Sequence, residues 1–252
     1  MRIEGSIALV TGAASGIGRR FAEALVASGG RVLAADIDEP GLQELAAALP
    51  RERIEILHMD VSQERSVGPM LAGLAERGIV ADLLVNNAGI LRDGKLASLD
   101  PGGFARKLPT AQWASVLATN LTGPFLLARE FVSARLEQQS GGGLIVNISS
   151  VSSTGNAGQS NYAAAKAGLD ALTRTWSMEL AGHGIRVAGL APGVTDTAMA
   201  ATLDPEVCAR LIAGMPLGRM ISTEEIWLGL RFIIDCDAFH GRTLVIDGGG
   251  EL

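Results

Sequence analysis

Short apolar runs alternate with longer segments of helical period along this chain of 252 residues. The runs are rich in Val, Ile and Leu, as in strands that are buried on both faces, and the segments between them repeat apolar residues three and four positions apart. Alternation of strand and helix is typical of a parallel sheet with right-handed crossovers. We expect strands at 6–11, 31–36, 53–59, 83–86, 144–149, 186–191 and 243–246, and helices at 16–28, 40–49, 64–77, 110–138, 161–181 and 223–235.

This pattern predicts an α/β fold: a Rossmann-type, doubly wound parallel sheet of about seven strands with helices on both faces. No Pro- and Ser-rich linker, charge block or repeat divides the chain, so residues 1–252 are predicted to form a single domain. Segment 94–109 interrupts the alternation. Its turn signal, Asp100-Pro101-Gly102-Gly103, predicts a small hairpin insertion, which is a surface decoration or else part of a substrate lid or a subunit contact.

Composition excludes several classes of function. The net charge is −6 and no cluster of Lys and Arg is present, which argues against a nucleic-acid partner, because binding to phosphate backbones depends on clustered basic residues. The start is too polar for a secretory signal, and no run reaches the roughly 18 apolar residues of a membrane span. We therefore expect a cytoplasmic protein with no membrane partner. Two cysteines, Cys208 and Cys236, are too few for a disulfide framework and lack the spacing of a metal site.

A glycine-rich turn follows the first predicted strand and opens a helix. Glycines let the backbone turn sharply and approach a pyrophosphate, whose charge the N-terminus of the next helix stabilises. An ordinary strand-to-helix turn can also contain glycines, but the position in the first βαβ unit favours a dinucleotide site. The turn reads Thr11-Gly12-Ala13-Ala14-Ser15-Gly16-Ile17-Gly18, and the predicted contacts are Gly12, Ser15, Gly16, Ile17 and Gly18.

Asp36 ends the second predicted strand, eighteen residues after Gly18. A carboxylate at this point can accept hydrogen bonds from both hydroxyls of an adenosine ribose, and it repels a 2′-phosphate. NADP sites usually place Arg or Lys nearby, whereas this chain has Ser15 and Ile37 at the candidate positions. NAD is therefore the predicted cofactor. The alternative is that Asp36 serves only as a helix cap.

A second acidic strand end, Asp60-Val61, suits the adenine amino group of the same cofactor. Such sites need only a few polar anchors. Asp60-Val61-Ser62 also reads as the N-cap of the next helix, so both interpretations stay open.

Tyr162 and Lys166 lie four residues apart near the start of a predicted helix, which puts phenol and ammonium on one face. A free tyrosine titrates near ~10, and an adjacent cation favours the phenolate. Tyr162 is also the one tyrosine in the sequence. Such pairs commonly form exposed helix faces as well, so the spacing alone does not decide between the two interpretations.

A series of motifs spans the chain. They are Thr11-Gly12-x-x-x-Gly16-x-Gly18, Asn86-Asn87-Ala88-Gly89, Asn120, Ser149-Ser150, Tyr162-x-x-x-Lys166 and Pro192-Gly193. In order and approximate spacing this series resembles the short-chain dehydrogenase/reductase family over essentially the whole chain. Within the family it is most similar to the 3-oxoacyl reductase branch, through residues 155–162 and 246–249, and bacterial members of that branch sometimes carry an insertion comparable to 94–109.

The resemblance implies a role for each motif residue. Tyr162 is expected to be the general acid/base, with Lys166 lowering its pKa and holding the nicotinamide ribose. A serine hydroxyl is expected to bind the substrate oxygen, and Asn120 to hold a water behind Lys166. The implied cofactor contacts after the fourth and sixth strands are Asn87, Ala88 and Gly89, and Pro192, Gly193, Val194, Thr195 and Thr197.

Two serines compete for the substrate oxygen. The usual spacing to the tyrosine in this family selects Ser149, whereas alignment on the strand selects Ser150. A one-residue slip turns the side chains of a strand to the opposite face, while loop lengths drift more easily. We therefore favour Ser150.

The predicted activity is NAD-dependent hydride transfer between nicotinamide and a secondary alcohol or ketone, possible substrates being 3-hydroxyacyl/3-oxoacyl compounds or other apolar molecules. One alternative is a catalytically inactive NAD-binding regulatory protein, against which the intact Asn120, serine, Tyr162 and Lys166 argue. Another is epimerase or dehydratase chemistry on nucleotide sugars, whose enzymes usually have a different glycine spacing and a longer C-terminal region.

Substrate binding and assembly are the last two expectations. Segment 195–216 is predicted to be a substrate loop that excludes water, with Met199, Leu203, Leu211 and Met215 available to cover an apolar ligand. The resemblance alone implies a homotetramer with the helices at 110–138 and 161–181 as interface. Small residues such as Ala163, Ala164, Ala167 and Gly168 permit close helix approach there, or pack on the protein's own sheet.

Overall fold

The computed structural model describes residues 1–197, 200, 209 and 212–250. Among these residues, seven strands form one parallel sheet in the order β3-β2-β1-β4-β7-β8-β9, which confirms the predicted doubly wound fold. The strands are β1 (Ile7–Thr11), β2 (Arg31–Asp36), β3 (Ile54–His58), β4 (Leu83–Asn86), β7 (Gly143–Ile148), β8 (Ile185–Pro192) and β9 (Thr243–Ile246).

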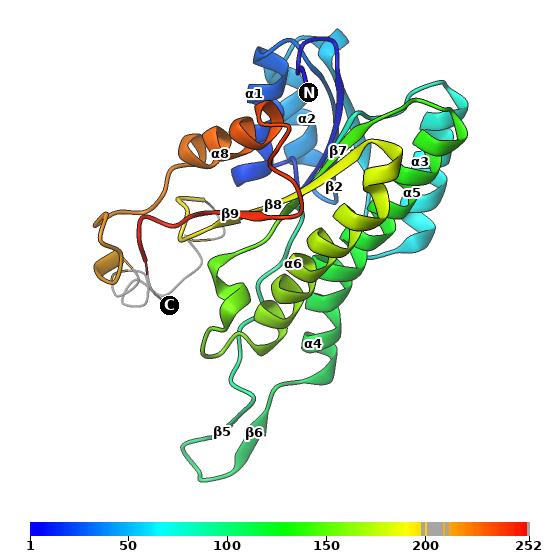
Figure 1. The fold of residues 1–252 in the computed structure, drawn as a ribbon. Helices are drawn as coiled ribbons and strands as arrows, with labels where there is room; N and C mark the ends of the chain where they lie inside the picture. Colours follow the sequence, from blue (N-terminus) through cyan, green and yellow to red (C-terminus); the bar gives the residue numbers. More distant parts are fainter. Residues whose placement is uncertain (198–199, 201–208, 210–211, 251–252) are drawn as a thin grey trace.

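Helices cover both faces of this sheet (Figure 1). One face packs against α1 (Gly16–Ala27), α2 (Glu39–Ala48) and α8 (Thr223–Asp235). The other face packs against α3 (Glu64–Glu76), α5 (Gly123–Glu137) and α6 (Ser160–Leu180).

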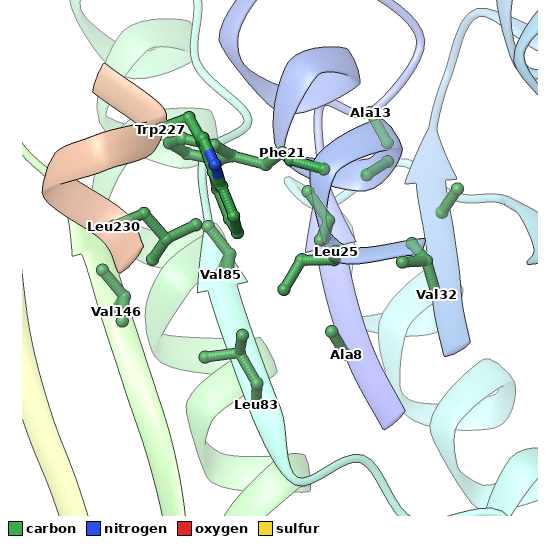
Figure 2. Packing of buried hydrophobic residues seen from close by; sticks show 14 of the residues in the cluster. Ala8, Ala13, Phe21, Leu25, Val32, Leu83, Val85, Val146, Trp227 and Leu230 are labelled. Carbon is green, nitrogen blue, oxygen red and sulfur yellow. The ribbon is translucent and has the colours of Figure 1, made fainter. Parts of the chain in front are cut away.

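The strands are apolar on both sides because each face has its own core. Ala8 and Val10 of β1 belong to the first core, and Leu9 between them belongs to the second. Figure 2 shows the first core, where Phe21 of α1 and Trp227 of α8 pack over the sheet. Neighbouring strands therefore hold a fixed register, since a one-residue slip would exchange the two cores.

The strand order reverses direction between β1 and β4. From β1 the chain crosses to β2 and then β3 on one side, whereas β4 leads to β7, β8 and β9 on the other. The crossovers leave a crevice beyond the carboxyl ends of β1 and β4, which is where open α/β sheets bind their ligands.

The predicted helix at 110–138 is interrupted. It consists of α4 (Thr110–Leu117), a π-helical turn (Ala118–Thr122) and α5. In the turn, the N–H of Gly123 donates to the carbonyl of Ala118, five residues earlier. In an α-helix the N–H of residue 124 would donate to the carbonyl of Asn120, four residues earlier, but Pro124 has no N–H. The chain thus stays helical from 110 to 137, as expected, with a π-helical turn that the pattern did not predict.

Segment 94–109 contains an antiparallel hairpin of β5 (Ala97–Leu99) and β6 (Ala105–Lys107). Its turn is closed by the N–H of Gly103, which donates to the carbonyl of Asp100. The hairpin projects away from the sheet below α4 (Figure 1).

The remaining regular elements within residues 1–197 are short 3-10 turns at Arg51–Arg53, Val151–Thr154 and Ala181–His183. No helix in the described part of the chain has the length and apolar character needed to cross a membrane.

Candidate active site

A cavity of about 510 Å³ opens at the carboxyl ends of the strands, within the size range of small-molecule and cofactor sites. It brings together most of the predicted site residues from segments far apart in the sequence. Those that line it are Gly12, Ser15, Gly16, Ile17, Asp36, Asp60, Val61, Asn87, Ala88, Gly89, Ser150, Tyr162, Lys166, Pro192, Gly193, Val194, Thr195 and Thr197. Of the predicted catalytic and cofactor-binding residues, Gly18 and Asn120 do not line it.

The glycine-rich turn forms one end of the cavity. Gly12 and Gly16 have positive φ angles of 66° and 55°, a backbone conformation that residues with a side chain rarely adopt. A Cβ on Gly12 would lie 2.8 Å from Nδ2 of Asn87, so the glycine keeps the backbone open. Gly18 has a supporting role, because a Cβ there would collide with the carbonyl of Gly12. The first N–H groups of α1 are therefore directed to this end, where they suit a phosphate.

The loop after β4 is tied to the end of β1. The N–H groups of Asn87 and Ala88 both donate to Thr11 Oγ1 at 3.0 Å, and Asn87 Nδ2 donates to the carbonyl of Thr11 at 2.9 Å. These bonds hold the two strand ends that flank the crevice.

The Asp36 carboxylate points back to the glycine-rich turn. Oδ2 accepts from the N–H of Ala14 and Oδ1 from the N–H of Asp38, both at 3.0 Å. The cap of α2 is Asp38, which accepts from the N–H of Gly41 at 3.2 Å. Asp36 therefore lines the cavity without being the helix cap that was the alternative interpretation.

Asp60 accepts bonds within its own turn. Its Oδ1 accepts from the N–H of Ser62 at 2.9 Å and from the Ser62 hydroxyl at 2.7 Å. The N-cap of α3 is Gln63, so Asp60 does not cap this helix. Asp60 and Val61 both line the cavity next to Met59.

Tyr162, Lys166 and Ser150 meet at the other end of the cavity. The ammonium of Lys166 lies 5.5 Å from the centroid of the Tyr162 ring, and its Nζ donates to the carbonyl of Ile148 at 2.6 Å. Burial raises the pKa of Tyr162 to about 12, a hydrogen-bonding interaction with the Ser150 side chain opposes this shift, and the charge of Asp93 adds to it. Burial lowers the pKa of Lys166 to about 8, against the opposing influence of Asp170.

These directions differ from the expectation that Lys166 lowers the pKa of Tyr162. Burial is the largest cause of both shifts, since it penalises the phenolate and the ammonium alike. The amine of Lys166 donates a hydrogen bond to the main-chain carbonyl of Ile148 and lies over the ring of Tyr162. It does not hydrogen-bond the phenol oxygen. In this arrangement the neutral phenol of Tyr162 is favoured over the phenolate.

The two candidate serines point in different directions. Ser150 interacts with Tyr162 and also accepts from the N–H of Ser152 at 3.1 Å. The hydroxyl of Ser149 is directed at the carbonyl of Lys166, at 3.5 Å. The register of β7 thus places Ser150 beside Tyr162.

Asn120 lies in the π-helical turn and is fully buried. Its Oδ1 accepts from the N–H of Ile90 at 2.8 Å, and its Nδ2 donates to the carbonyl of the same residue at 3.0 Å. The side chain is thereby occupied in holding the loop after β4. A role for Asn120 in a proton relay would have to use its main-chain carbonyl, which receives no bond from Pro124.

The loop after β8 completes the cavity. The Gly193 N–H donates to the carbonyl of Ile246 at 2.8 Å, and a Cβ on Gly193 would lie 2.8 Å from Cα of Asp247. Thr197 lies against the glycine-rich turn, 3.4 Å from the position of a Cβ on Gly16. Met199, Leu203 and Leu211 of the predicted substrate loop lie outside the described residues. Met215 is buried and does not line the cavity, in contrast to its predicted place.

Five polar residues of the cavity wall were not predicted as site residues. They come from three segments: the loop after β4, the π-helical turn and the connection between β7 and α6. Only the pattern around residues 155–162 gave a signal that could have found two of them. They are Asp93, Thr119, Ser152, Asn156 and Gln159.

The residues present fit a dinucleotide. The glycines leave room for it beside the start of α1, and the same cavity is lined by Asp36 and by Tyr162. In the described part of the chain no group of three or more His, Cys, Asp or Glu side chains is placed to hold a metal ion.

Residues 6–207 match the family described as short chain dehydrogenase. The chain belongs to this family. Named relatives in the family are the 3-oxoacyl-[acyl-carrier-protein] reductases FabG of Salmonella typhimurium and Thermotoga maritima. They are 37% and 35% identical to this chain, and the alignments cover 99% of it and 98% and 99% of the relatives.

Solved structures of other short-chain dehydrogenases have the same fold. A candidate gluconate dehydrogenase from Agrobacterium tumefaciens superposes with a TM-score of 0.89 at 33% identity, covering 98% of this chain and 96% of the other. The structure of a candidate NAD(P) dependent gluconate 5-dehydrogenase from Beutenbergia cavernae, which contains NADP at low occupancy, superposes with a TM-score of 0.88 at 32% identity. This alignment covers 99% of this chain and 98% of the other. The family and these relatives show an oxidoreductase that binds a nicotinamide cofactor.

Proposed function

We propose that this protein transfers a hydride between NAD and a secondary alcohol or ketone, with 3-hydroxyacyl/3-oxoacyl compounds as the first substrate class to test. The observation that carries the proposal is the meeting of Ser150, Tyr162 and Lys166 in the same cavity as the glycine-rich turn. The named reductase relatives support the substrate class.

The cofactor, when bound, supplies or accepts the hydride, and the protein supplies position and a proton. Gly12, Ser15, Gly16 and Ile17 would hold its pyrophosphate, with Gly18 supporting the turn. The other cofactor contacts we propose are Asp36, Asp60, Val61, Asn87, Ala88, Gly89, Pro192, Gly193, Thr195 and Thr197, together with Tyr162 and Lys166.

In the direction of ketone reduction, the hydroxyls of Tyr162 and Ser150 bind the carbonyl oxygen of the substrate. Tyr162 donates its proton to that oxygen as negative charge develops there, and Ser150 stabilises the charge by a hydrogen bond. The raised pKa of Tyr162 keeps the phenol protonated until negative charge develops on the substrate oxygen. Lys166, buried beneath the ring, is placed to return a proton to the phenol after turnover.

NAD is proposed over NADP because of the charge around Asp36. Its carboxylate is held by two backbone N–H groups, and its neighbour Ile37 is 64% exposed and carries no charge. A 2′-phosphate placed at this carboxylate would meet like charge without a cation at positions 15 or 37. The NADP in the Beutenbergia structure favours the opposite choice, so both cofactors belong in the test.

A homotetramer in the cytoplasm is the proposed state of assembly. Ala164 and Ala167 are exposed on α6 and available to a partner, whereas Gly168 packs on Leu121 of its own chain. Light scattering at micromolar concentration tests this assembly, and a monomer would refute it.

The experiment that tests the activity is a panel of 3-oxoacyl thioesters, sugar-acid ketones and simple ketones. Each is incubated with reduced NAD or NADP, and the loss of nicotinamide absorbance is followed. Turnover of at least one ketone is expected. Tight cofactor binding without turnover of any substrate would favour the regulatory alternative.

A further inference from the structure

A row of polar side chains lines the cavity next to Tyr162. Oδ2 of Asp93 accepts from Nε2 of Gln159 at 3.0 Å, and Oε1 of Gln159 accepts from Nδ2 of Asn156 at 3.1 Å. The same Nδ2 lies 3.4 Å from Oγ of Ser152. All four side chains line the cavity, and we call them the polar wall. Because they orient one another, the wall is ordered before a substrate enters.

The main chain fixes Asp93 against the catalytic helix. The N–H of Gly94 donates to the carbonyl of Gly158 at 2.7 Å, and Nδ2 of Asn161 donates to the carbonyl of Arg92 at 2.9 Å. The residues on both sides of Asp93 are therefore bonded to the N-terminal end of α6: Arg92 to Asn161 in its first turn, and Gly94 to Gly158, two residues before the helix begins. The hydrogen-bond partner of Asp93, Gln159, is the N-cap residue of α6, three residues before Tyr162.

Asp93 brings a carboxylate close to the reacting group. Its charge raises the pKa of Tyr162, and partial burial raises the pKa of Asp93 itself, with the bond from Gln159 opposing this. Within the described residues, Gln159 is the one side chain that hydrogen-bonds the carboxylate. An ionised carboxylate only accepts hydrogen bonds, and it has room for several. The cavity-facing part of Asp93 therefore suits a donor.

We propose that Asp93 determines specificity by accepting a hydrogen bond from a neutral donor on the substrate, a hydroxyl or an amide N–H, near the reacting carbon. The inference rests on the proposed function, since it concerns the same cavity. A substrate with such a donor gains a charged hydrogen bond, one without it leaves the carboxylate to water, and one with a carboxylate at this point is repelled. The favoured class is thus oxo compounds bearing a donor rather than wholly apolar ketones.

Two kinds of substrate carry this chemistry. The arm of an acyl thioester has amide N–H groups, and an open-chain sugar acid has hydroxyls. Three probes separate them: the acetoacetyl thioester of N-acetylcysteamine, with an amide N–H; the 5-oxo derivative of gluconate, with hydroxyls; and ethyl acetoacetate, with no donor.

Asp93→Asn is the test variant, because the amide keeps the size of the side chain and removes the charge. Asp100→Asn is the matched control, since Asp100 lies in the hairpin turn, away from the cavity lining. We expect Asp93→Asn to raise KM for at least one donor-bearing probe by about tenfold to a hundredfold, the range for a hydrogen bond to a charged group. Any change in kcat/KM for ethyl acetoacetate reports the effect of the Asp93 charge on Tyr162 and should be smaller than the change for that donor-bearing probe, and Asp100→Asn should change neither.

The probe that loses affinity identifies the donor. An equal loss on all three probes would assign Asp93 a merely structural role, and no loss on any would remove it from substrate binding; either result overturns the proposal. If the unaltered protein reduces no ketone of the wider panel described under the proposed function, that function fails separately. Calorimetric binding of the two donor-bearing probes to both proteins in the presence of NAD then decides the role of Asp93 by the same comparison.

Discussion

The ammonium of Lys166 lies 5.5 Å from the centre of the Tyr162 ring, and both side chains are embedded at the inner end of one cavity. The amine is anchored on the carbonyl of Ile148 at the end of β7. Tyr162 is therefore packed against a residue of its own helix, in a cavity that Ser150 also lines. This relationship makes the roles of the two residues separable by substitution.

Tyr162→Phe should abolish turnover and leave cofactor affinity within a few-fold of normal, because the substitution removes the transferable proton and little else. Turnover is followed by nicotinamide absorbance and affinity by calorimetry. Near-normal kcat in this variant would remove Tyr162 from its proposed role.

Lys166 should make stability depend on pH in a defined window. Its pKa is lowered by burial to about 8 in the folded protein, whereas an unfolded chain has a value near 10.5. Between these values the unfolded state binds more protons, so the contribution of Lys166 to the free energy of unfolding rises with pH. Tyr162, whose pKa is raised to about 12, acts in the opposite direction, but only above about pH 10.

Urea unfolding at pH 7.5, 8.5 and 9.5 tests this expectation, with Lys166→Met as the comparison because Met has a similar length and no charge. The difference between the free energy of unfolding of the unaltered protein and that of the variant should increase as the pH rises. Parallel pH profiles for the two proteins would show that Lys166 keeps an ordinary pKa.

Ser150 and Ser149 give a direct comparison of neighbouring hydroxyls. Ser150→Ala should lower kcat/KM by about tenfold to a hundredfold, since it removes a hydrogen bond to developing charge. Ser149→Ala should change kcat/KM by less than about threefold, because its hydroxyl is directed at the carbonyl of Lys166. The reverse order of effects would mean that the strand register is not what selects the serine.

The fold was predictable because it depends on local pattern. Strands such as β2 and β4 have the predicted bounds, since each is a short apolar run closed by a polar residue. The interruption at residues 118–122 was not predicted. Apolar periodicity continues through it, and the one local signal is Pro124, which has no N–H to donate to the carbonyl of Asn120.

The candidate site was predictable where one motif carries several residues, as in the glycine-rich turn. The polar wall was not, because Asp93 and Gln159 are 66 positions apart and meet only through the fold. The shifted pKa of Tyr162 could not be predicted either, since burial and not the neighbouring Lys166 is its largest cause. Spacing identifies which groups share a helix face, but not how far they are removed from water.

Cofactor choice should be decided by Asp36 independently of catalysis. Charged hydrogen bonds from ribose hydroxyls are worth roughly 1.5–3 kcal/mol, and a 2′-phosphate would meet repulsion in their place. NAD should therefore be preferred over NADP by at least about a hundredfold in kcat/KM, using roughly 1.4 kcal/mol per tenfold. The double variant Asp36→Ala, Ile37→Arg removes the repulsion and supplies a phosphate partner, so it should reverse the preference. Both cofactors are measured with both proteins and one ketone. Equal use of NADP by the unaltered protein would show that the Asp36 carboxylate, although held by Ala14 and Asp38, does not face the ribose.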